Sequence, residues 1–212
     1  MHTGGWTVII PVKPALSAKS RLGLGPGFAR ALALDTVAAV VACDAVARVI
    51  VVTSDSDFRP PGAEIAEEAS PTGIDAAIRT GVSLVVEGSC AEVPSLGSSD
   101  SPAGPLAALL GDLPSLRPAD LAAALALAAA HPRAFVTDRE STGTTLVTAA
   151  AGLPLLTAFG PGSAAAHRAL GLRQLELLFG STVTADVDTI EQLDRARDLG
   201  LGPATLAALA AR

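Results

Sequence analysis

The sequence of 212 residues contains no tyrosine, a single tryptophan and only five phenylalanines. Proteins that bind single-stranded nucleic acid stack the bases on aromatic side chains, and this chain offers few of them. The scarcity argues against that class of protein. The core must instead be built from Ala, Leu, Val and Ile, which make up most of the 50% of residues that are hydrophobic.

Positive charge is scarce as well. The chain has 15 Lys and Arg against 21 Asp and Glu, which gives a formal net charge of -6 at pH 7. A field of this sign repels phosphate groups, so we expect neither nucleic acid nor a membrane surface as a partner. An anionic ligand would therefore need a local cationic pocket or a metal ion.

Signals for export or membrane insertion are missing from the sequence. The first residues lack a basic segment, and no apolar run approaches the roughly 20 residues that span a bilayer. The two cysteines, Cys43 and Cys90, lack the spacing of metal ligands, and we expect them to be reduced thiols. These features predict a cytoplasmic protein.

The chain does show a regular alternation of short β-branched runs with longer Ala- and Leu-rich segments of helical period. The pattern predicts an α/β fold: one domain over residues 1–212, with a mostly parallel sheet and helices on both faces. Expected strands cover 6–10, 48–53, 106–110, 134–138 and 144–149. Expected helices cover 28–42, 73–86 and 118–130, with one after Ser163 and one begun by Thr189, where Gln192 completes a capping box. Residues 88–105, rich in Ser, Gly and Pro, predict an exposed loop.

Three cations, Lys13, Lys19 and Arg21, follow the first expected strand. In open α/β sheets the loop after a strand lies at the carboxyl edge, where ligands bind. The loop is therefore a candidate cradle for a nucleoside triphosphate. A solvated basic loop is the alternative, because the sequence has neither a P-loop nor a G-x-G-x-x-G fingerprint.

Three aspartates are placed to reach the same edge. Asp112 follows the strand at 106–110. Asp186 and Asp188 are separated by one residue, so in an extended segment both side chains lie on the same side. Magnesium usually takes one or two carboxylates together with substrate phosphates. The three together predict a magnesium site, although one aspartate alone would more simply cap a helix or hold a turn.

Two loops, Thr142-Gly143-Thr144-Thr145 and Gly160-Pro161-Gly162-Ser163, combine hydroxyl groups with glycine. The second precedes an expected helix, whose free N–H groups favour an anion, so the loops are candidates for holding a phosphate and a carboxylate. Ordinary turns are the alternative. His167 is left out of the catalytic set, because a lone histidine on an Ala-rich helix is more often structural. No G-x-S-x-G elbow supports a serine hydrolase.

Taken in order, these segments resemble the 2-phospho-L-lactate/phosphoenolpyruvate guanylyltransferase family, which supplies the activated precursor of the deazaflavin coenzyme F-420. The resemblance spans nearly the whole chain. Its most specific parts are Gly111-Asp112-Leu113-Pro114, Thr142-Gly143-Thr144, Phe159-Gly160-Pro161-Gly162-Ser163 and Asp186-Val187-Asp188-Thr189.

The resemblance implies a nucleotide-diphospho-sugar-transferase-like fold, and transfer of GMP from GTP to phosphoenolpyruvate or 2-phospho-L-lactate with release of pyrophosphate and with Mg²⁺ as cofactor. It implies metal binding by Asp112, Asp186 and Asp188, and contact with the acceptor by Thr144, Gly160 and Ser163. It implies nucleotide binding by Lys13, Lys19, Arg21, Gly73 and Asp75, and catalytic roles for Lys19, Arg21 and Asp112. The chain departs from the family at two places: Asp75 stands where Asn is usual, and Ser141 where Gly is usual.

The expected reaction needs no general base, because a phosphate monoester with a second pKa of about 6 is already largely ionised near neutrality. Two alternatives stay open at this point. One is another nucleotidyltransferase of the same fold, with a molybdopterin or a sugar phosphate as acceptor. The other is a non-catalytic module that binds a nucleotide. The oligomeric state is also open.

Overall fold

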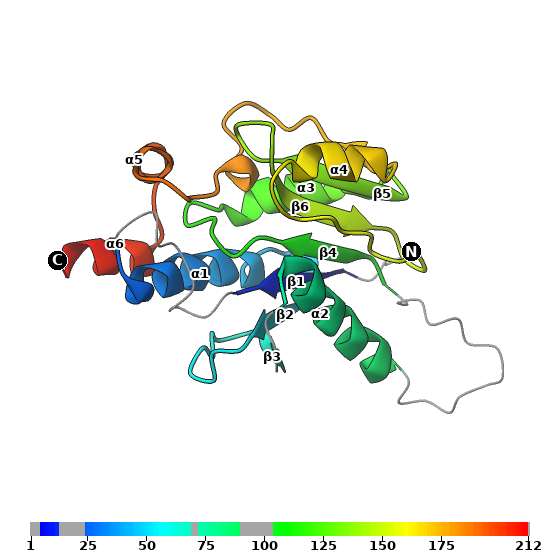
Figure 1. The fold of residues 1–212 in the computed structure, drawn as a ribbon, viewed down its shortest axis with the longest axis horizontal. Helices are drawn as coiled ribbons and strands as arrows, with labels where there is room; N and C mark the ends of the chain where they lie inside the picture. The colour runs from blue at the N-terminus through cyan, green and yellow to red at the C-terminus, as the bar shows by residue number, and fades with distance from the viewer. Residues whose placement is uncertain (1–4, 13–23, 69–71, 90–103, 212) are drawn as a thin grey trace.

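A sheet of seven strands runs through the computed structural model, which describes residues 5–12, 24–68, 72–89 and 104–211 (Figure 1). Its strands are β1 Trp6–Pro11, β2 Val46–Thr53, β3 Glu64–Glu67, β4 Leu106–Leu109, β5 Arg133–Thr137, β6 Thr144–Ala149 and β7 Arg173–Gln174. The helices are α1 Pro26–Val41, α2 Ile74–Ser89, α3 Pro118–Ala128, α4 Ser163–Ala169, α5 Ile190–Leu199 and α6 Pro203–Ala210, with a 3-10 turn η2 at Thr182–Thr184. Most of the expected 88–105 loop lies outside the described residues.

The strands follow the order β3-β2-β1-β4-β6-β5-β7, and the sheet is mostly parallel, as predicted. Strand β6 pairs antiparallel with both β4 and β5, while the other pairs are parallel. Val8, Ile9 and Ile10 in β1 are fully buried. Their continuous apolar run is typical of a parallel strand that is covered on both faces.

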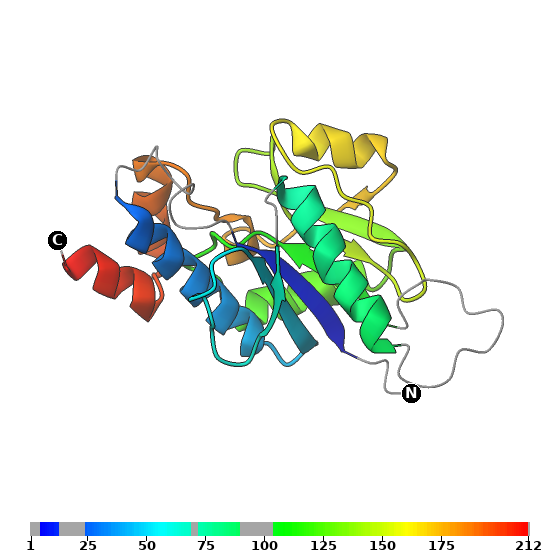
Figure 2. The same ribbon diagram turned by 60° about the horizontal axis from the view of Figure 1, so that its bottom comes forward.

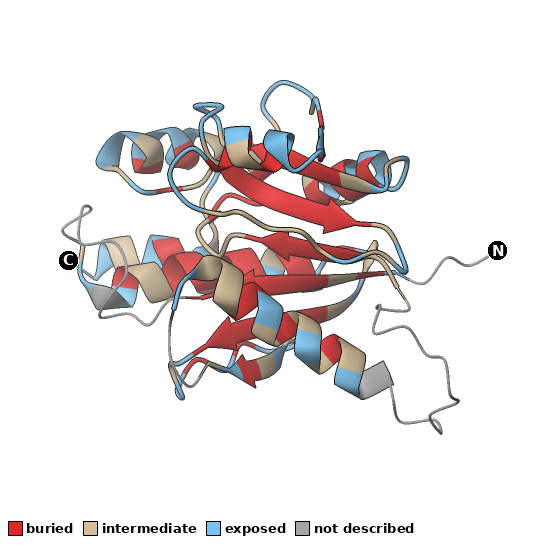
Figure 3. Ribbon diagram, turned by 45° about the vertical axis from the view of Figure 1, so that its right-hand side comes forward, coloured by how far each residue is buried: buried red, intermediate tan, exposed pale blue. Residues whose placement is uncertain are grey.

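Helices cover both faces of the sheet, as the alternating pattern predicted. On one face, residues of α1 and α3 such as Val37 and Leu125 pack with Val8 and Ile10. On the opposite face, α2 packs Ala77 and Val85 against alternate strand residues, and α4 adds a smaller cluster (Figures 2 and 3). No helix within the described ranges is long and apolar enough to cross a membrane.

Helix α2 lies very close to β1 because it carries a glycine at the crossing. A Cβ added to Gly81 would meet Ile9 Cγ2 at 2.5 Å, nearer than side-chain atoms pack. This close packing fixes α2 on the sheet, and with it Asp75 in the first turn of the helix.

Two strands and one helix of the structure were not predicted. Strands β3 and β7 are short and lie at the two edges of the sheet, and α6 closes the described chain. Asp35, a buried carboxylate in α1, accepts hydrogen bonds from Ala204 N at 2.9 Å and Thr205 N at 2.7 Å. This contact caps the first turn of α6 and holds that helix against α1.

Candidate active site

The reversed direction of β6 gathers the candidate residues at one edge of the sheet. Thr144 begins β6, whereas Leu109 ends β4 and Thr137 ends β5. Because β6 is antiparallel to both neighbours, its amino end lies beside their carboxyl ends. The hydrogen bond from Leu110 N to Thr145 O, 2.9 Å long, continues the pairing to this edge. The loops after β4 and β5 and the start of β6 therefore meet there.

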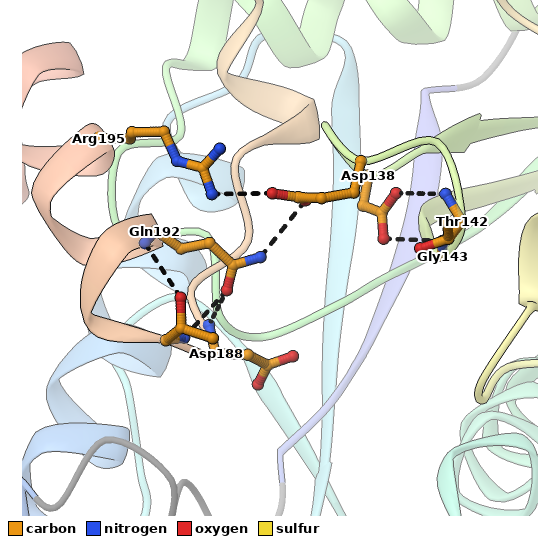
Figure 4. A network of polar contacts seen from close by, with 8 residues as sticks. Asp138, Thr142, Gly143, Asp188, Gln192 and Arg195 are labelled. Atoms are coloured by element: carbon orange, nitrogen blue, oxygen red, sulfur yellow. Dashed lines mark hydrogen bonds and ion pairs between the residues drawn. The ribbon is translucent and has the colours of Figure 1, made fainter.

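The segments that carry the three predicted metal ligands lie side by side. Val187 N donates to the carbonyl oxygen of Asp112 at 3.0 Å, which joins Asp186-Val187-Asp188 to the loop after β4. Oδ1 of Asp112 and Oδ1 of Asp186 are buried, whereas Asp188 is exposed. The carboxylate of Asp188 points away from α5 (Figure 4).

The grouping alone does not make a complete metal site. Among the residues that the structure describes, no group of three or more His, Cys, Asp or Glu side chains is placed to hold a metal ion. Two buried carboxylate oxygens fit an ion that draws its other ligands from substrate phosphates, as magnesium commonly does. Magnesium at Asp112, Asp186 and Asp188 stays a prediction.

The loop that carries Asp112 is fixed from two sides. Thr36 of α1 accepts a hydrogen bond from Leu113 N at 2.9 Å and donates to Leu32 O at 2.9 Å. A Cβ on Gly111 would lie 3.2 Å from Pro11 O, so glycine permits close contact with the end of β1. Strand β1 ends here at Pro11, and Lys13, Lys19 and Arg21 follow it in the sequence. These three predicted nucleotide contacts lie outside the described residues.

The segment that carries Asp186 and Asp188 is held at both ends. Before it, Asp120 accepts from Thr182 N at 2.9 Å and from Thr182 Oγ1 at 2.6 Å. After it, Gln192 Oε1 accepts from Asp188 N at 2.8 Å and from Thr189 N at 3.0 Å, while Gln192 N donates to Thr189 Oγ1. The predicted capping box is confirmed.

A polar network that was not predicted links the turn before β6 to α5 (Figure 4). The carboxylate of Asp138 accepts from Thr142 N at 2.9 Å and Gly143 N at 2.7 Å, which closes the turn. Glu140, in the same turn, contacts Gln192 Nε2 at 3.4 Å and forms an ion pair with Arg195 at 2.8 Å. An aspartate directly after a strand and four residues before Thr-Gly was a usable signal for the turn. No sequence signal marked the partners of Glu140.

The two loops predicted to hold the acceptor also lie together. Ala164 N donates to Thr142 O at 3.2 Å, which brings Thr144 and Ser163, both buried, into one region with the exposed Gly160. The prediction of free N–H groups at the start of α4 is wrong for the amides of Ser163 to Ala165. They donate to the carbonyl oxygens of Gly160, Thr142 and Gly162.

His167 lies at the centre of this region and is fully buried. Its Nε2 accepts from Ala158 N at 2.9 Å, and its Nδ1 lies 2.9 Å from Thr144 Oγ1. Because an amide is always a donor, Nε2 is unprotonated and the ring proton is on Nδ1. Burial lowers the pKa of His167, although the nearby carboxylate of Asp75 acts in the opposite direction. The ring is therefore a structural link with both nitrogens engaged.

Gly73 and Asp75, the other predicted nucleotide contacts, lie at the start of α2. Gly73 has φ 120°, a conformation that glycine adopts readily. Asp75 Oδ1 accepts a hydrogen bond from Phe159 N at 3.1 Å. The carboxylate thus touches the loop predicted for the acceptor, a contact that sequence spacing does not reveal.

Comparison with solved structures identifies the class of fold. The chain is similar to a nucleotide-diphospho-sugar transferase from Desulfovibrio desulfuricans, with a TM-score of 0.64 and 16% identity over 97% of this chain and 94% of that one. It is also similar to 4-diphosphocytidyl-2C-methyl-D-erythritol synthase, with a TM-score of 0.55 and 13% identity over 92% and 97% of the two chains. The fold is that of nucleotide-diphospho-sugar transferases.

Sequence relatives are more specific. The chain is 45% identical to phosphoenolpyruvate guanylyltransferase of Streptomyces coelicolor, over 98% of this chain and 96% of the relative. It is 43% identical to that of Streptomyces scabiei, over 97% and 96%, and 40% identical to that of Thermomonospora curvata, over 98% and 89%. No family model matches. The chain belongs to the phosphoenolpyruvate guanylyltransferase family.

Proposed function

We propose that this protein transfers GMP from GTP to phosphoenolpyruvate and releases pyrophosphate. The observation that carries the proposal is the contact between Val187 N and Asp112 O. It places the aspartate segments at the sheet edge where Thr144 and Ser163 also lie. A chain of this family thereby has carboxylates that could hold a magnesium ion on loops that neighbour the hydroxyl groups proposed to bind the acceptor.

The reaction forms one P–O bond and breaks another. An oxygen of the acceptor phosphate attacks the α-phosphorus of GTP, and the bond from that phosphorus to the bridging oxygen of the β-phosphate breaks. The electron pair leaves with pyrophosphate. Since the acceptor phosphate is largely ionised near neutrality, the attack needs no proton acceptor. A reaction without a general base is consistent with the contacts of His167, because both of its ring nitrogens are engaged, with Ala158 and Thr144.

The protein's part is to align two anions and to offset their charge. Asp112, Asp186 and Asp188 would hold magnesium, which would neutralise charge on the phosphates when bound. Lys13, Lys19 and Arg21 are proposed to contact the triphosphate, because the chain enters their segment at Val12, against Gly111. Thr144, Gly160 and Ser163 are proposed to position the acceptor.

The test is an assay of pyrophosphate release with GTP and Mg²⁺, in which phosphoenolpyruvate, 2-phospho-L-lactate and 3-phosphoglycerate are supplied one at a time. The expected result is release with phosphoenolpyruvate, and a product whose mass is that of the acid plus a guanylyl group. Asp188→Asn is the control, because it should abolish release while circular dichroism and thermal unfolding stay unchanged. The proposal fails if none of the acids supports release, or if the variant releases pyrophosphate as fast as the parent.

A further inference from the structure

Two consecutive backbone amides before α4 are held by side chains from two different helices. Ala158 N donates to His167 of α4 at 2.9 Å, and Phe159 N donates to Asp75 of α2 at 3.1 Å. We call residues 158–163 the acceptor loop, because they contain Gly160 and Ser163. The loop is therefore tied to both helices immediately before Gly160.

The tie through His167 is buried. The imidazole is fully buried and packs edge to face with the ring of Phe159, with ring centroids 5.2 Å apart and an interplanar angle of 75°. Its other nitrogen reaches Thr144 Oγ1. One side chain thus connects the acceptor loop to the hydroxyl group that begins β6.

The tie through Asp75 comes from a different part of the fold. Asp75 is in the first turn of α2, the helix that Gly81 allows to lie against Ile9 of β1. The views of the ribbon place the start of α2 towards α4 (Figures 1 and 2). Asp75 therefore fixes the position of the acceptor loop relative to β1. This is the strand that precedes Lys13, Lys19 and Arg21 in the sequence.

A carboxylate facing a site for anions needs a reason, because it repels them. Asp75 is half-buried, and among the residues that the structure describes its carboxylate accepts one hydrogen bond, from the Phe159 amide. A hydrogen bond from an amide to a carboxylate is stronger than one to a neutral acceptor. The hydrogen bond to the Phe159 amide therefore gives Asp75 a structural role that does not involve the nucleotide.

We propose that Asp75 is a positioning residue for the acceptor: it sets the conformation of the acceptor loop and thereby the affinity for the phosphorylated acid, and it is not a contact to the base or ribose of the nucleotide. The proposal rests on the proposed function. It differs from the role that the family resemblance implies for this position.

The two roles predict opposite kinetic effects. In Asp75→Ala the acceptor loop loses its tie to α2, and the KM for phosphoenolpyruvate should rise about tenfold, the loss expected for one hydrogen bond to a charged group. The KM for GTP should stay within about twofold of the parent. Asp75→Asn keeps an oxygen that accepts from Phe159 N and should restore the KM for the acid. Glu87→Ala removes an exposed carboxylate from the same helix and should change neither constant.

Three results would overturn the proposal. A rise in the KM for GTP alone would make Asp75 a nucleotide contact. Unchanged KM values together with a lower stability would show that Asp75 only stabilises the start of α2. An Asp75→Asn variant as impaired as Asp75→Ala would show that charge, not the hydrogen bond, matters. If Asp75→Ala does not fold, Asp75→Ser replaces it, because serine is well tolerated at the start of a helix but is too short to reach the loop.

Hydrogen exchange separates failure of this inference from failure of the proposed function. Amide exchange followed by mass spectrometry should be faster in the peptide that covers 157–163 of Asp75→Ala, and unchanged in Asp75→Asn and Glu87→Ala. This readout needs no substrate, so it applies even if the parent protein releases no pyrophosphate. Equal exchange in Asp75→Ala and the parent would contradict the proposal.

Discussion

Ser141 has φ 61° and is the one residue other than glycine with positive φ in the described part of the chain. It stands in the turn that Asp138 closes, where the family usually has glycine. A left-handed conformation costs a residue with a side chain roughly 1 kcal/mol or more, whereas glycine adopts it freely. The departure that stood out in the sequence therefore has a structural cost, because the turn keeps a conformation suited to glycine.

Substitutions at Ser141 should follow this cost. Ser141→Val puts a β-branched side chain at positive φ and should lower the free energy of unfolding by about 1–2 kcal/mol. Ser141→Gly removes the strain but adds freedom to the unfolded chain, so its effect should lie within about 1 kcal/mol of zero. Urea denaturation at pH 7.5 measures both. A valine variant as stable as the parent would contradict the strain.

His167 should make stability depend on pH. Burial lowers its pKa in the folded protein below the ordinary value of 6.5, so between the two values the unfolded chain binds more protons than the folded one. The contribution of His167 is complete above about pH 7 and is lost as the pH falls below 6.5, by up to about 1.4 kcal/mol per unit.

Denaturation of the parent and of His167→Gln at pH 7.5, 6.5 and 5.5 measures this dependence. The variant should be less stable throughout and should lack the extra loss at low pH. His131→Gln, which changes a histidine outside the site, should keep that loss. If the stability of the parent and of His167→Gln fell in parallel with pH, the buried imidazole of His167 would not be the source of the loss at low pH.

Helix α5 links stability to the site through Gln192. The side chain completes the capping box and also holds the amide of Asp188, so Gln192→Ala should cost about 1 kcal/mol of stability and lower kcat. Arg197→Ala removes only an exposed ion pair with Asp194 on the same helix, and it should change stability by less than about 1 kcal/mol and leave kcat unchanged. Thermal unfolding and the pyrophosphate assay measure both effects. Loss of stability with normal kcat would limit Gln192 to capping.

The elements that sequence patterns predicted are those with strong local signals. Strand β1 is a continuous apolar run, and α5 has its capping box. Strand β7 has only two residues, and β3 has four with acidic residues at both ends, so neither carries a pattern that stands out. Helix α6 is different, because Pro203 at its first position and the Ala and Leu residues after it are ordinary signals for a helix.

The candidate site also has some features that the sequence could predict and others that it could not. The backbone contact between the Asp112 loop and the segment of Asp186 and Asp188 agrees with an edge of the sheet that gathers distant loops, although the second segment follows the 3-10 turn η2 and not a strand. The contacts of Asp75 with Phe159 and of His167 with Ala158 were not predictable, because they depend on how two loops pack above that edge. Periodicity and spacing report the direction of a strand or a helix face, but they do not report which amide a side chain meets.

The charge of the chain bears on the proposed function as well as on its partners. With a net charge of -6, the protein repels a nucleoside triphosphate at long range, so tight binding of GTP should require magnesium. At a ligand concentration 100 times its dissociation constant, binding stabilises a protein by about 2.7 kcal/mol. For a chain of this length, that raises Tm by roughly 5–10 °C.

We therefore expect GTP with Mg²⁺ to raise Tm by that amount, and GTP with EDTA to raise it much less. Asp112→Asn removes a carboxylate from the proposed site and should abolish the difference between the two conditions. Asp44→Asn, which makes the same change of charge at an exposed position, should keep it. An equal rise with EDTA and with Mg²⁺ in the parent would mean that the nucleotide is held by protein groups alone, and the aspartates would then need another explanation for their position at the sheet edge.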